Sequence, residues 1–319
     1  MTKILLTVLC AVAGVLWLWI ALIALLDSSI DWNDGVSPQI EYVTGSAGQV
    51  LLPASVNGID LGLCLLDSGA EPKMMAITPS AANRAGLSTS RLLPWSRVNG
   101  SYGSTGLVPN RVADEFAVGP LILRDVRLAE IAELAGTAPE DEAKRIGGIC
   151  SSAIFQSSVI DIDWRAGTAS LYKPDNLPAD LETAPWIPLV EEDGMAYVSI
   201  TVEDNHDGLF LIDTGQTSAI HFYVSAVDDS DLLAGRAVRS QVRHGIGGSG
   251  IVSVGQVTSL TLSNYRVGPV AASFDTMERY RKERKFSGRI GIDLLRHFRI
   301  IMDMQAERVA FITYDVARE

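Results

Sequence analysis

The feature that most constrains the fold of this chain is a strand-and-turn motif that occurs twice. Residues 62–71 read GLCLLDSGAE and residues 208–217 read GLFLIDTGQT. The two segments agree at both glycines, at two leucines and at the aspartate, and Ser68 stands opposite Thr214. In each copy the aspartate follows a run of apolar residues, where a buried strand would end. The fold must therefore supply a partner or a task for each carboxylate.

The ends of the two copies also match. Residues 150–172 align without gaps on residues 290–312, and Asp163 falls on Asp303. A repeat of about 140 residues is far longer than the unit of a solenoid. The chain has 319 residues, of which 47% are apolar and 20% charged, so it is long enough for two lobes of ordinary size. The sequence therefore predicts a duplicated lobe.

Each copy begins with a hairpin pattern. Residues 49–70 read as strand, Asn-Gly turn and strand, and residues 195–216 repeat this plan with Asp-Asn-His-Asp at the turn. After the first motif, Thr78 is the expected N-cap of a short helix that starts at Pro79 and stops at Gly86. The second copy indicates no comparable helix. Later segments are β-like and punctuated by glycine, so we expect a mainly β chain with two related lobes.

The sequence divides into four expected parts. These are an N-terminal transmembrane signal anchor (residues 1–26), a tether (27–47), a first lobe (48–185) and a second lobe (186–319). The tether mixes turn formers with acidic residues and shows no sustained period.

The predicted anchor is the apolar run over residues 4–26. Its 23 positions carry no charge and exceed the roughly 20 residues that cross a bilayer as a helix. A cleaved signal peptide is the alternative, but its apolar region is shorter and ends at a small-residue cleavage site. Lys3 precedes the run, and Asp27, Asp31 and Asp34 follow it. This charge bias predicts a single-pass protein with a cytoplasmic N-terminus and extracytoplasmic lobes, which are periplasmic if the source is bacterial.

Composition and motifs exclude several other classes of function. The 26 basic and 38 acidic residues give a net charge of −12, so we expect no nucleic-acid partner. No CxxC pair and no HExxH motif occurs, so no metal is predicted. Residues 245–250, GIGGSG, satisfy the GxGxxG pattern of dinucleotide-binding loops, but a strand pattern follows where such a loop needs a helix, and no cofactor is predicted. Cys64 and Cys150 are expected to be buried free thiols, with a disulfide between them as the alternative.

Two carboxylates suit the hydrolysis of a peptide bond. Without a metal or a nucleophilic side chain, a water must be deprotonated while the carbonyl oxygen of the scissile bond is protonated. Two carboxyl groups held close together cannot both ionise, so the pair keeps one shared proton. The ionised member can then act as the base and the protonated member as the acid.

The paired Asp-Ser/Thr-Gly motifs, each followed by a Gly-rich hairpin and a late apolar strand, resemble the aspartic proteases of the retropepsin and pepsin type. The resemblance rests on four segments: LLDSGA, ITPSAANRAGL, LIDTGQTS and GRIGIDLLRHFRIIMD. It implies an all-β, two-lobed acid protease fold with the active site between the lobes and with Asp67 and Asp213 as the catalytic residues. Because one chain supplies both motifs, as in pepsin, no homodimer is required to build the site.

Four neighbours are expected to support this pair. Gly69 and Gly215 let the backbone approach the carboxylates without a side-chain clash. Ser68 and Thr214 each supply a hydroxyl that, by the resemblance, bonds to the opposite lobe. Gln216 stands where relatives usually carry Ala or Ser; it contacts the substrate or faces solvent, and both possibilities stay open.

A Gly-rich hairpin follows each motif at a similar spacing. The first, residues 98–106, begins 31 residues after Asp67, and the second, residues 243–250, begins 30 residues after Asp213. The matched spacing predicts a pair of flaps that cover the site. Tyr102 resembles the flap tyrosine of pepsin-type relatives, and the alternative is an ordinary exposed loop aromatic. The candidate flap and substrate-binding residues are Tyr102, Gly103, Gly247 and Gly248.

The late strand departs from the family pattern in the first copy. The second copy carries the apolar-apolar-Gly element approximately, as Arg289-Ile290-Gly291. The first copy has Ile149-Cys150-Ser151 at the related place. We therefore expect the two halves of the site to differ slightly.

The sequence favours a membrane-anchored aspartic endopeptidase that acts on polypeptides outside the cytoplasm. Its expected partners are the lipid bilayer, through residues 4–26, and a polypeptide substrate at or near the membrane. The alternative is a catalytically silent two-lobed β protein that binds polypeptides without cutting them. Such a protein has no reason to keep both aspartates together with both hydroxyl and both glycine neighbours.

Overall fold

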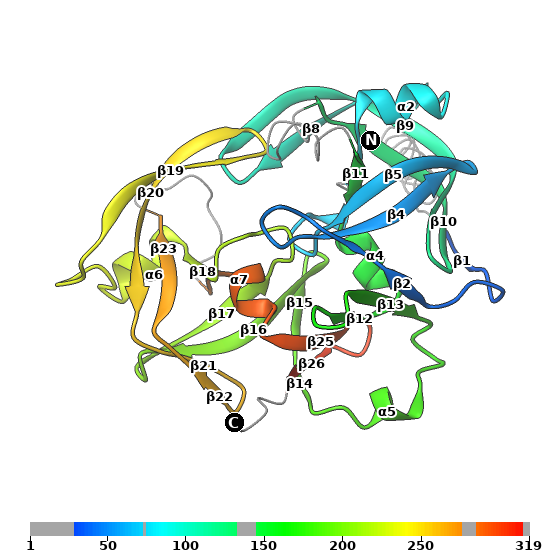
Figure 1. Ribbon diagram of the computed structural model, residues 1–319. Coiled ribbons are helices and arrows are strands. Elements are labelled where there is room, and N and C mark those ends of the chain that lie inside the picture. Colours follow the sequence, from blue (N-terminus) through cyan, green and yellow to red (C-terminus); the bar gives the residue numbers. More distant parts are fainter. Residues whose placement is uncertain (1–28, 73–74, 133–144, 276–284, 315–319) are drawn as a thin grey trace, which may run out of the picture.

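The structure is a computed structural model that describes residues 29–72, 75–132, 145–275 and 285–314 (Figure 1). The fold is mainly β, as the sequence predicts. Its strands form three sheets, two of ten strands and one of six. The predicted membrane segment, residues 4–26, lies outside the described residues. Within the part that is described, no helix is both long enough and apolar enough to cross a membrane.

The first ten-stranded sheet is built from the first lobe. Its order is β1-β10-β6-β11-β5-β4-β9-β7, with β3 on β4 and β8 on β9. The strands are β1 (Ser29–Trp32), β3 (Val43–Thr44), β4 (Val50–Val56), β5 (Ile59–Leu66), β6 (Ala76–Ile77), β7 (Ser88–Thr89), β8 (Trp95–Gly100), β9 (Gly103–Val118), β10 (Leu121–Glu130) and β11 (Ile146–Cys150).

The second ten-stranded sheet is built from the second lobe. Its order is β19-β20-β23-β18-β24-β17-β16-β21-β22, with β15 on β16. The strands are β15 (Val190–Glu192), β16 (Met195–Val202), β17 (His206–Ile212), β18 (Ile220–Phe222), β19 (Arg239–Gly245), β20 (Gly248–Val257), β21 (Leu260–Leu262), β22 (Tyr265–Val267), β23 (Val270–Phe274) and β24 (Phe286–Ile290).

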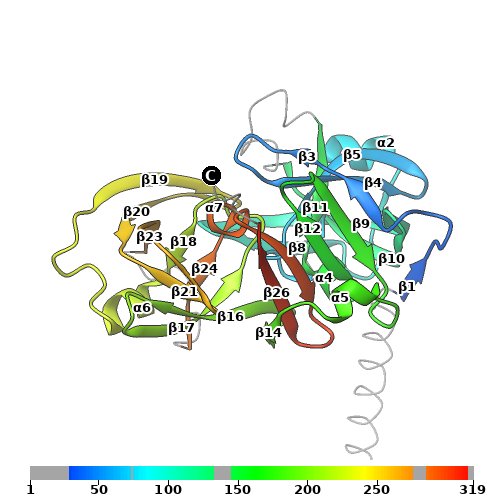
Figure 2. The ribbon, with the colours of Figure 1, turned by 60° about the horizontal axis from the view of Figure 1, so that its bottom comes forward.

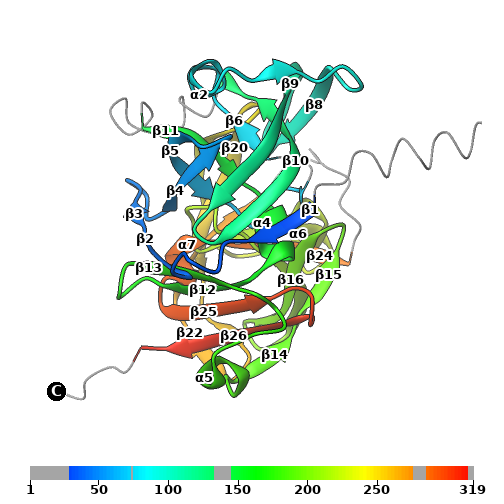
Figure 3. The same cartoon turned by 90° about the vertical axis from the view of Figure 1, so that its right-hand side faces the viewer.

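The six-stranded sheet takes strands from both halves of the chain, and Figure 2 shows it between the other two sheets. Its strands are β2 (Gln39–Glu41), β12 (Val159–Asp163), β13 (Thr168–Tyr172), β14 (Trp186–Pro188), β25 (Phe298–Asp303) and β26 (Arg308–Thr313). Figure 3 shows them stacked in the order β2, β13, β12, β25, β26 and β14. The short described helices are α2 (Pro79–Arg84), α4 (Ser152–Ser157), α5 (Ala179–Glu182), α6 (Val224–Asp229) and α7 (Ile292–Leu295).

The two copies meet at the centre of the six-stranded sheet. Antiparallel pairing of β12 with β25 puts Asp161 opposite Ile301, with Ile160 opposite Met302 and Ile162 opposite Ile300. The gapless alignment of the two copies also matches position 161 with position 301. Each strand therefore faces its own counterpart, and the copies are related by an approximate twofold axis through this pair.

Apolar side chains from both copies form one main core. It includes Leu66 at the end of β5 and Ile212 at the end of β17, and both are fully buried. Strand β5 pairs in parallel with β11, and β17 pairs in parallel with β24. Parallel neighbours lie in sheet interiors, which explains why these strands read as nearly continuous apolar runs. The aspartate after each strand thus emerges from the middle of a sheet.

The segment expected to be a tether, residues 27–47, requires a correction. Residues 29–44 form three short strands: β1 pairs with β10, β2 with β13 and β3 with β4. Backbone hydrogen bonds along the edge of a sheet hold strands of two to four residues, so no alternation of side chains marks them in the sequence. Ile40 of β2 is buried and belongs to the main core. The remaining division, into residues 48–185 and 186–319, stays a prediction.

The helices bear out one expectation and correct another. Thr78 caps α2 by accepting a hydrogen bond from the Ala81 N–H, and Pro79 is the first helical residue, as predicted. The second copy also has a helix, α6, which the sequence did not indicate. Its N-cap residue is Tyr223, whose side chain makes no capping hydrogen bond. The usual signature of Ser, Thr, Asp or Asn at the N-cap is therefore missing.

The two cysteines of the first lobe lie side by side as buried free thiols, as expected. Hydrogen bonding with Cys64, together with burial, raises the pKa of the Cys150 thiol. Both side chains are fully buried and act as small apolar groups in the core.

An ion pair links the two halves beside the twofold axis. Arg299 of β25 donates two hydrogen bonds to Asp161 of β12, at 2.9 and 2.7 Å. The Asp161 side chain is 6% exposed and that of Arg299 is 32% exposed. Removing the cation would leave a buried carboxylate without a partner.

We predict that Arg299→Met lowers the free energy of unfolding by about 1–3 kcal/mol, because Asp161 loses its two charge-assisted hydrogen bonds. The double variant Asp161→Leu/Arg299→Met removes the stranded charge as well and should recover most of this loss. Denaturant unfolding of the three chains measures the effect. If the double variant is as unstable as the single one, the loss comes from packing of the Arg299 stem rather than from charge.

Candidate active site

The ends of β5 and β17 place the two motif aspartates in equivalent positions. The Asp67 N–H donates to the carbonyl oxygen of Cys150 at 2.9 Å, and the Asp213 N–H donates to that of Ile290 at 2.9 Å. These bonds tie each aspartate to the late strand of its own lobe, β11 in the first and β24 in the second. The departure of the first copy from the family pattern, at Ser151, does not break this equivalence.

The hydroxyl groups beside the aspartates bridge the two lobes. The Ser68 hydroxyl donates to the carbonyl oxygen of Ile212 at 2.7 Å and accepts from the Thr214 N–H at 3.0 Å. The Thr214 hydroxyl donates to the carbonyl oxygen of Leu66 at 2.7 Å and accepts from the Ser68 N–H at 3.0 Å. Both side chains are buried, so the four bonds are shielded from water. Each motif is thereby fixed to the strand of the other.

The two motif glycines give room to the carboxylates of the opposite lobe. A Cβ atom on Gly69 would lie 2.3 Å from the Asp213 carboxylate oxygen Oδ1, and one on Gly215 would lie 2.4 Å from Oδ1 of Asp67. Neither contact is possible for a residue with a side chain. The structure thus brings Asp67, Asp213 and their four neighbours together in one place.

The two carboxylates have different surroundings. Oδ1 of Asp67 accepts from the Gly69 N–H at 2.9 Å. Oδ1 of Asp213 accepts from the N–H groups of Gly215 at 3.1 Å and Gln216 at 2.9 Å. Burial, followed by repulsion from Asp213, raises the pKa of Asp67 to about 7. The pair can therefore hold one proton at nearly neutral pH.

Arg289 is a member of the site that the sequence reasoning did not assign. Its Nη1 atom donates to Oδ2 of Asp213 at 3.0 Å, and the two side chains are 16% and 5% exposed. The signal that could have found it is a charged residue inside a short strand, directly before Ile290-Gly291. That residue appeared in the sequence only as a departure from the family pattern.

The predicted flap hairpins meet tip to tip, and Figure 1 shows β8–β9 and β19–β20 converging. A Cβ atom on Gly100 would lie 1.9 Å from the carbonyl oxygen of Ile246. One on Gly247 would lie 2.1 Å from the carbonyl oxygen of Gly103. The backbones of the two tips are therefore in direct contact.

Tyr102 lies at this contact and is partly buried there. A Cβ atom on Gly245 would come within 3.1 Å of its ring atom Cδ2. Gly248, with a φ of +126°, starts the second strand of its hairpin in a backbone conformation that favours glycine. Next to Tyr102, the hydroxyl of Ser101 lies 3.5 Å from Nη1 of Arg289. The first tip thus reaches the neighbourhood of Asp213.

For Gln216 the sequence left two possibilities open, contact with the substrate or exposure to solvent, and the structure bears on the second. Its side-chain amide nitrogen is buried without a hydrogen-bond partner among the described residues. The side chain packs against Gly291, where a Cβ atom would lie 2.8 Å from its Cγ. Its amide nitrogen therefore does not face solvent.

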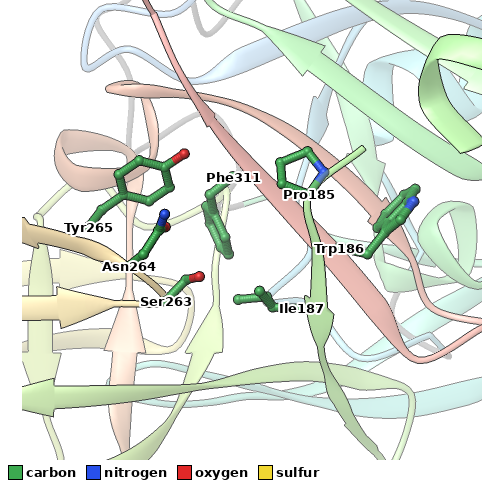
Figure 4. Close-up of a pocket in the computed structure, with 7 residues that line it drawn as sticks. All are labelled: Pro185, Trp186, Ile187, Ser263, Asn264, Tyr265 and Phe311. Atoms are coloured by element: carbon green, nitrogen blue, oxygen red, sulfur yellow. The ribbon is translucent and has the colours of Figure 1, made fainter. Parts of the chain in front are cut away.

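A small pocket elsewhere contains none of the motif residues (Figure 4). Its volume is about 180 Å³, and it lies between β14, β22 and β26. Its lining residues are Pro185, Trp186, Ile187, Ser263, Asn264, Tyr265 and Phe311. In the described ranges, no group of three or more His, Cys, Asp or Glu side chains is placed to hold a metal ion.

We predict that Thr214→Val destabilises the protein by about 1–3 kcal/mol, because the buried Leu66 carbonyl and Ser68 N–H each lose a partner. Thr214→Ser keeps the hydroxyl and is the matched control, with a much smaller loss. Thermal unfolding of both variants, with the rate of peptide cleavage as a second readout, measures the effect. Equal stability of the Val and Ser variants would contradict a bridging role for the hydroxyl.

Comparison with known proteins agrees with this geometry. Residues 52–147 match the aspartyl protease family. The matched segment contains Asp67 and the whole first flap hairpin, and it ends before the second motif. None of the curated proteins compared with the chain matches it. The family match, which covers the first motif and its hairpin, confirms the resemblance to aspartic proteases. Residues 52–147 form an aspartyl protease domain, and this domain supports an aspartic-type peptidase.

Proposed function

We propose that this protein is a single-chain aspartic endopeptidase, anchored in a membrane by residues 4–26, that cuts polypeptides outside the cytoplasm with Asp67 and Asp213. The observation that carries the catalytic part of this proposal is the mutual placement of the two carboxylates. Each lies against the glycine of the other motif, within a frame fixed by the Ser68 and Thr214 hydroxyls. No second chain is needed to complete the pair.

The pair hydrolyses a peptide bond in two proton-balanced steps. In the first, the ionised carboxylate takes a proton from water, the resulting hydroxide bonds to the carbonyl carbon, and the protonated carboxyl gives its proton to the carbonyl oxygen. In the second, the newly protonated member gives its proton to the leaving nitrogen, and the other member takes one from the tetrahedral intermediate as the C–N bond breaks. Both carboxyl groups then return to their starting states.

The meeting hairpins support a closing role during this reaction. A substrate that lies against the aspartates has to pass between them and the two tips, so the tips must part and close again. Closure excludes water other than the attacking molecule and so strengthens the electrostatic interactions in the site. Tyr102 and Gly103 of the first tip and Gly247 and Gly248 of the second are the proposed flap residues.

A silent polypeptide-binding protein is the weaker proposal. Binding alone needs neither two carboxylates that repel one another nor their burial, which raises the pKa of Asp67 to about 7. Keeping such a pair costs stability without a chemical task.

We predict that Asp67→Asn and Asp213→Asn each lower the rate of peptide cleavage by at least a factor of about 10²–10⁴, since one carboxyl cannot serve as acid and base together. Asp114→Asn, at an exposed position of β9, is the control and should keep full activity. Cleavage of a peptide library by the purified chains measures the rates. Substantial activity in either active-site variant would sink the assignment of the pair.

The pH profile of the natural chain provides a second readout of the same pair. Asp67 must hold the proton or share it, and it loses this proton as the pH rises through about 7. Cleavage should therefore fall above about pH 7. A rate that stays constant well above this value would argue that the reaction does not need a protonated carboxyl.

The proposed anchor places the lobes close to a bilayer. Because β1 begins at Ser29, only residues 27–28 separate the folded part from the apolar run, in place of the longer tether expected from the sequence. At about 3.6 Å for each residue, this linker holds the first lobe at the membrane surface. Confinement of this kind raises the effective concentration of membrane-bound substrates without any new contact in the site.

We predict that a chain beginning at Asp27 cuts a freely diffusing peptide about as fast as the full chain but processes a membrane-tethered substrate poorly. The comparison requires equal amounts of extracytoplasmic enzyme and a direct measurement of the substrate fragment. If both chains process the tethered substrate equally well, the apolar run serves export or retention, and the proposal of a juxtamembrane substrate class fails.

A further inference from the structure

Arg289 occupies a defined place in the frame of the second lobe. It is the penultimate residue of β24 and precedes Ile290, whose carbonyl oxygen accepts from the Asp213 N–H. Its side chain lies against Asp213, with Nη1 3.0 Å from Oδ2. Despite burial, which lowers it, the pKa of Arg289 is raised by Tyr223 and Asp213, so the guanidinium is charged.

The corresponding position of the first lobe is apolar. Arg289 is in register with Leu211 of β17, and Ile149 of β11 is in register with Leu65 of β5. These registers make Ile149 the counterpart of Arg289. Ile149 belongs to a small apolar cluster that includes Ala70, directly after the first motif. One aspartate of the pair thus has a cation beside it, and the other has an apolar surface.

The two carboxylates also differ in the number of hydrogen-bond donors that they accept from. Asp213 accepts from two backbone N–H groups on Oδ1 and from Arg289 on Oδ2. Asp67 accepts from the Gly69 N–H on Oδ1, while burial and the charge of Asp213 raise its pKa to about 7. More donors and a full positive charge stabilise the ionised form of Asp213.

Other titratable groups around Arg289 do not supply a competing anion. Burial raises the pKa of Tyr223, whose ring lies 5.5 Å from the guanidinium carbon, and that of Tyr197, so both phenols stay neutral. His221 of β18 is in register with Arg289, but its ring bonds to Ser273 and Asp275. The carboxylate that pairs directly with Arg289 is therefore that of Asp213.

We propose that Arg289 keeps Asp213 ionised and thereby localises the single proton of the pair on Asp67, so that Asp213 is the base and Asp67 the acid in the first step of cleavage. This inference rests on the proposed function, and it assigns the two roles that the twofold frame leaves equivalent. Arg289 touches a reacting group and sets its charge, but it transfers no proton itself.

Charge balance explains why a buried arginine favours this one state. With one proton on the pair, the cation and the single carboxylate cancel, and the buried site is neutral. With two protons, Arg289 is left buried without a counter-ion, and with none, two carboxylates face one cation. The singly protonated pair is the reactive form, so Arg289 protects it against a second proton at acidic pH.

The test compares pH profiles of kcat/KM for the natural chain, Arg289→Ile and Arg289→Lys. The Ile variant copies the first lobe at this position and removes the charge. Loss of the cation disfavours ionisation of the aspartate pair. Both limbs of the pH profile report the titration of this pair, so both should move to higher pH. The expected size is about 1–3 pH units for the limb that reports mainly Asp213, which pairs directly with Arg289. The Lys variant keeps the charge and should stay close to the natural profile. Arg266→Ile makes the same change in net charge at an exposed pair with Asp204 and should leave both limbs in place.

A second measurement does not depend on proteolysis. Asp67 binds its proton more tightly in the folded than in the unfolded chain, so the contribution of Asp67 to the stability of the natural chain falls as the pH rises from about 4 to about 7. Asp67→Asn lacks this loss, and its stability relative to the natural chain should rise over that range and level off near pH 7. When the same comparison is made between Arg289→Ile and the double variant Asp67→Asn/Arg289→Ile, the pH at which the stability difference levels off should be higher. Arg289→Gln gives the same comparison if the Ile variant does not fold.

The outcomes separate this inference from the proposed function. Upward shifts in both measurements support the inference. The inference is overturned if a folded Arg289→Ile or Arg289→Gln variant leaves both the limbs of the pH profile and the levelling-off point of the stability difference unchanged. It is also overturned if the variant only raises KM, because Arg289 would then be a substrate contact. If the natural chain cuts no peptide, the proposed function fails, and the stability titration still decides whether Arg289 sets the charge of the pair.

Discussion

Two carboxyl groups emerge from the ends of buried strands and lie against each other's motif, and the rest of the structure accommodates this contact. Bringing them together costs free energy, through burial and through mutual repulsion, and only a rigid frame can sustain it. The Ser68 and Thr214 hydroxyls supply that frame, because each satisfies a backbone carbonyl and a backbone N–H of the opposite lobe at once. Serine and threonine can do this without adding a charge to the site.

The backbone arrangement of the two lobes is symmetric, whereas the chemical roles of the two aspartates have to differ. Pairing of β12 with β25 relates the two copies by an approximate twofold axis. At the site, β11 pairs with β5 in the same way as β24 pairs with β17, so the two halves are also equivalent there. Hydrolysis nevertheless needs one acid and one base. A difference at a single position, Ile149 against Arg289, can supply this difference because neither side chain takes part in the hydroxyl network. The backbone of the duplicated lobe can then stay almost unchanged while the electrostatics of its two halves diverge.

The parts of the structure that the sequence predicted are those that local chemistry determines. Apolar strands that end on Asp-Ser-Gly and Asp-Thr-Gly specify their own turns, and Thr78 with Pro79 specifies the start of α2. Strands β1, β2 and β3 were missed because they are only two to four residues long and backbone hydrogen bonds hold them, to distant strands for β1 and β2 and to the adjacent β4 for β3. No side-chain pattern records those bonds. Helix α6 was missed because it lacks a capping side chain.

Arg289 was missed as a site residue for a different reason. A charged residue in a strand normally marks a position that faces solvent, and its sequence neighbours do not say which face of the sheet it lies on. Only the register of β24 against β17 shows that this side chain points toward Asp213. The residues that complete a site from a neighbouring strand are therefore the hardest to predict from one sequence.

Contact between the two hairpin tips brings the first hairpin close to the charged groups of the site. Gly100 lies at the end of β8 with a backbone conformation that other residues can adopt, yet a side chain there would strike the carbonyl of Ile246 on the other hairpin. The need for glycine is thus imposed by the tip of the other hairpin, so the two tips fit together as one unit with a half from each lobe. The first tip also brings Ser101 within 3.5 Å of the guanidinium nitrogen that holds Asp213. Arg289 therefore connects the first hairpin with the aspartate pair through hydrogen bonds from one nitrogen atom.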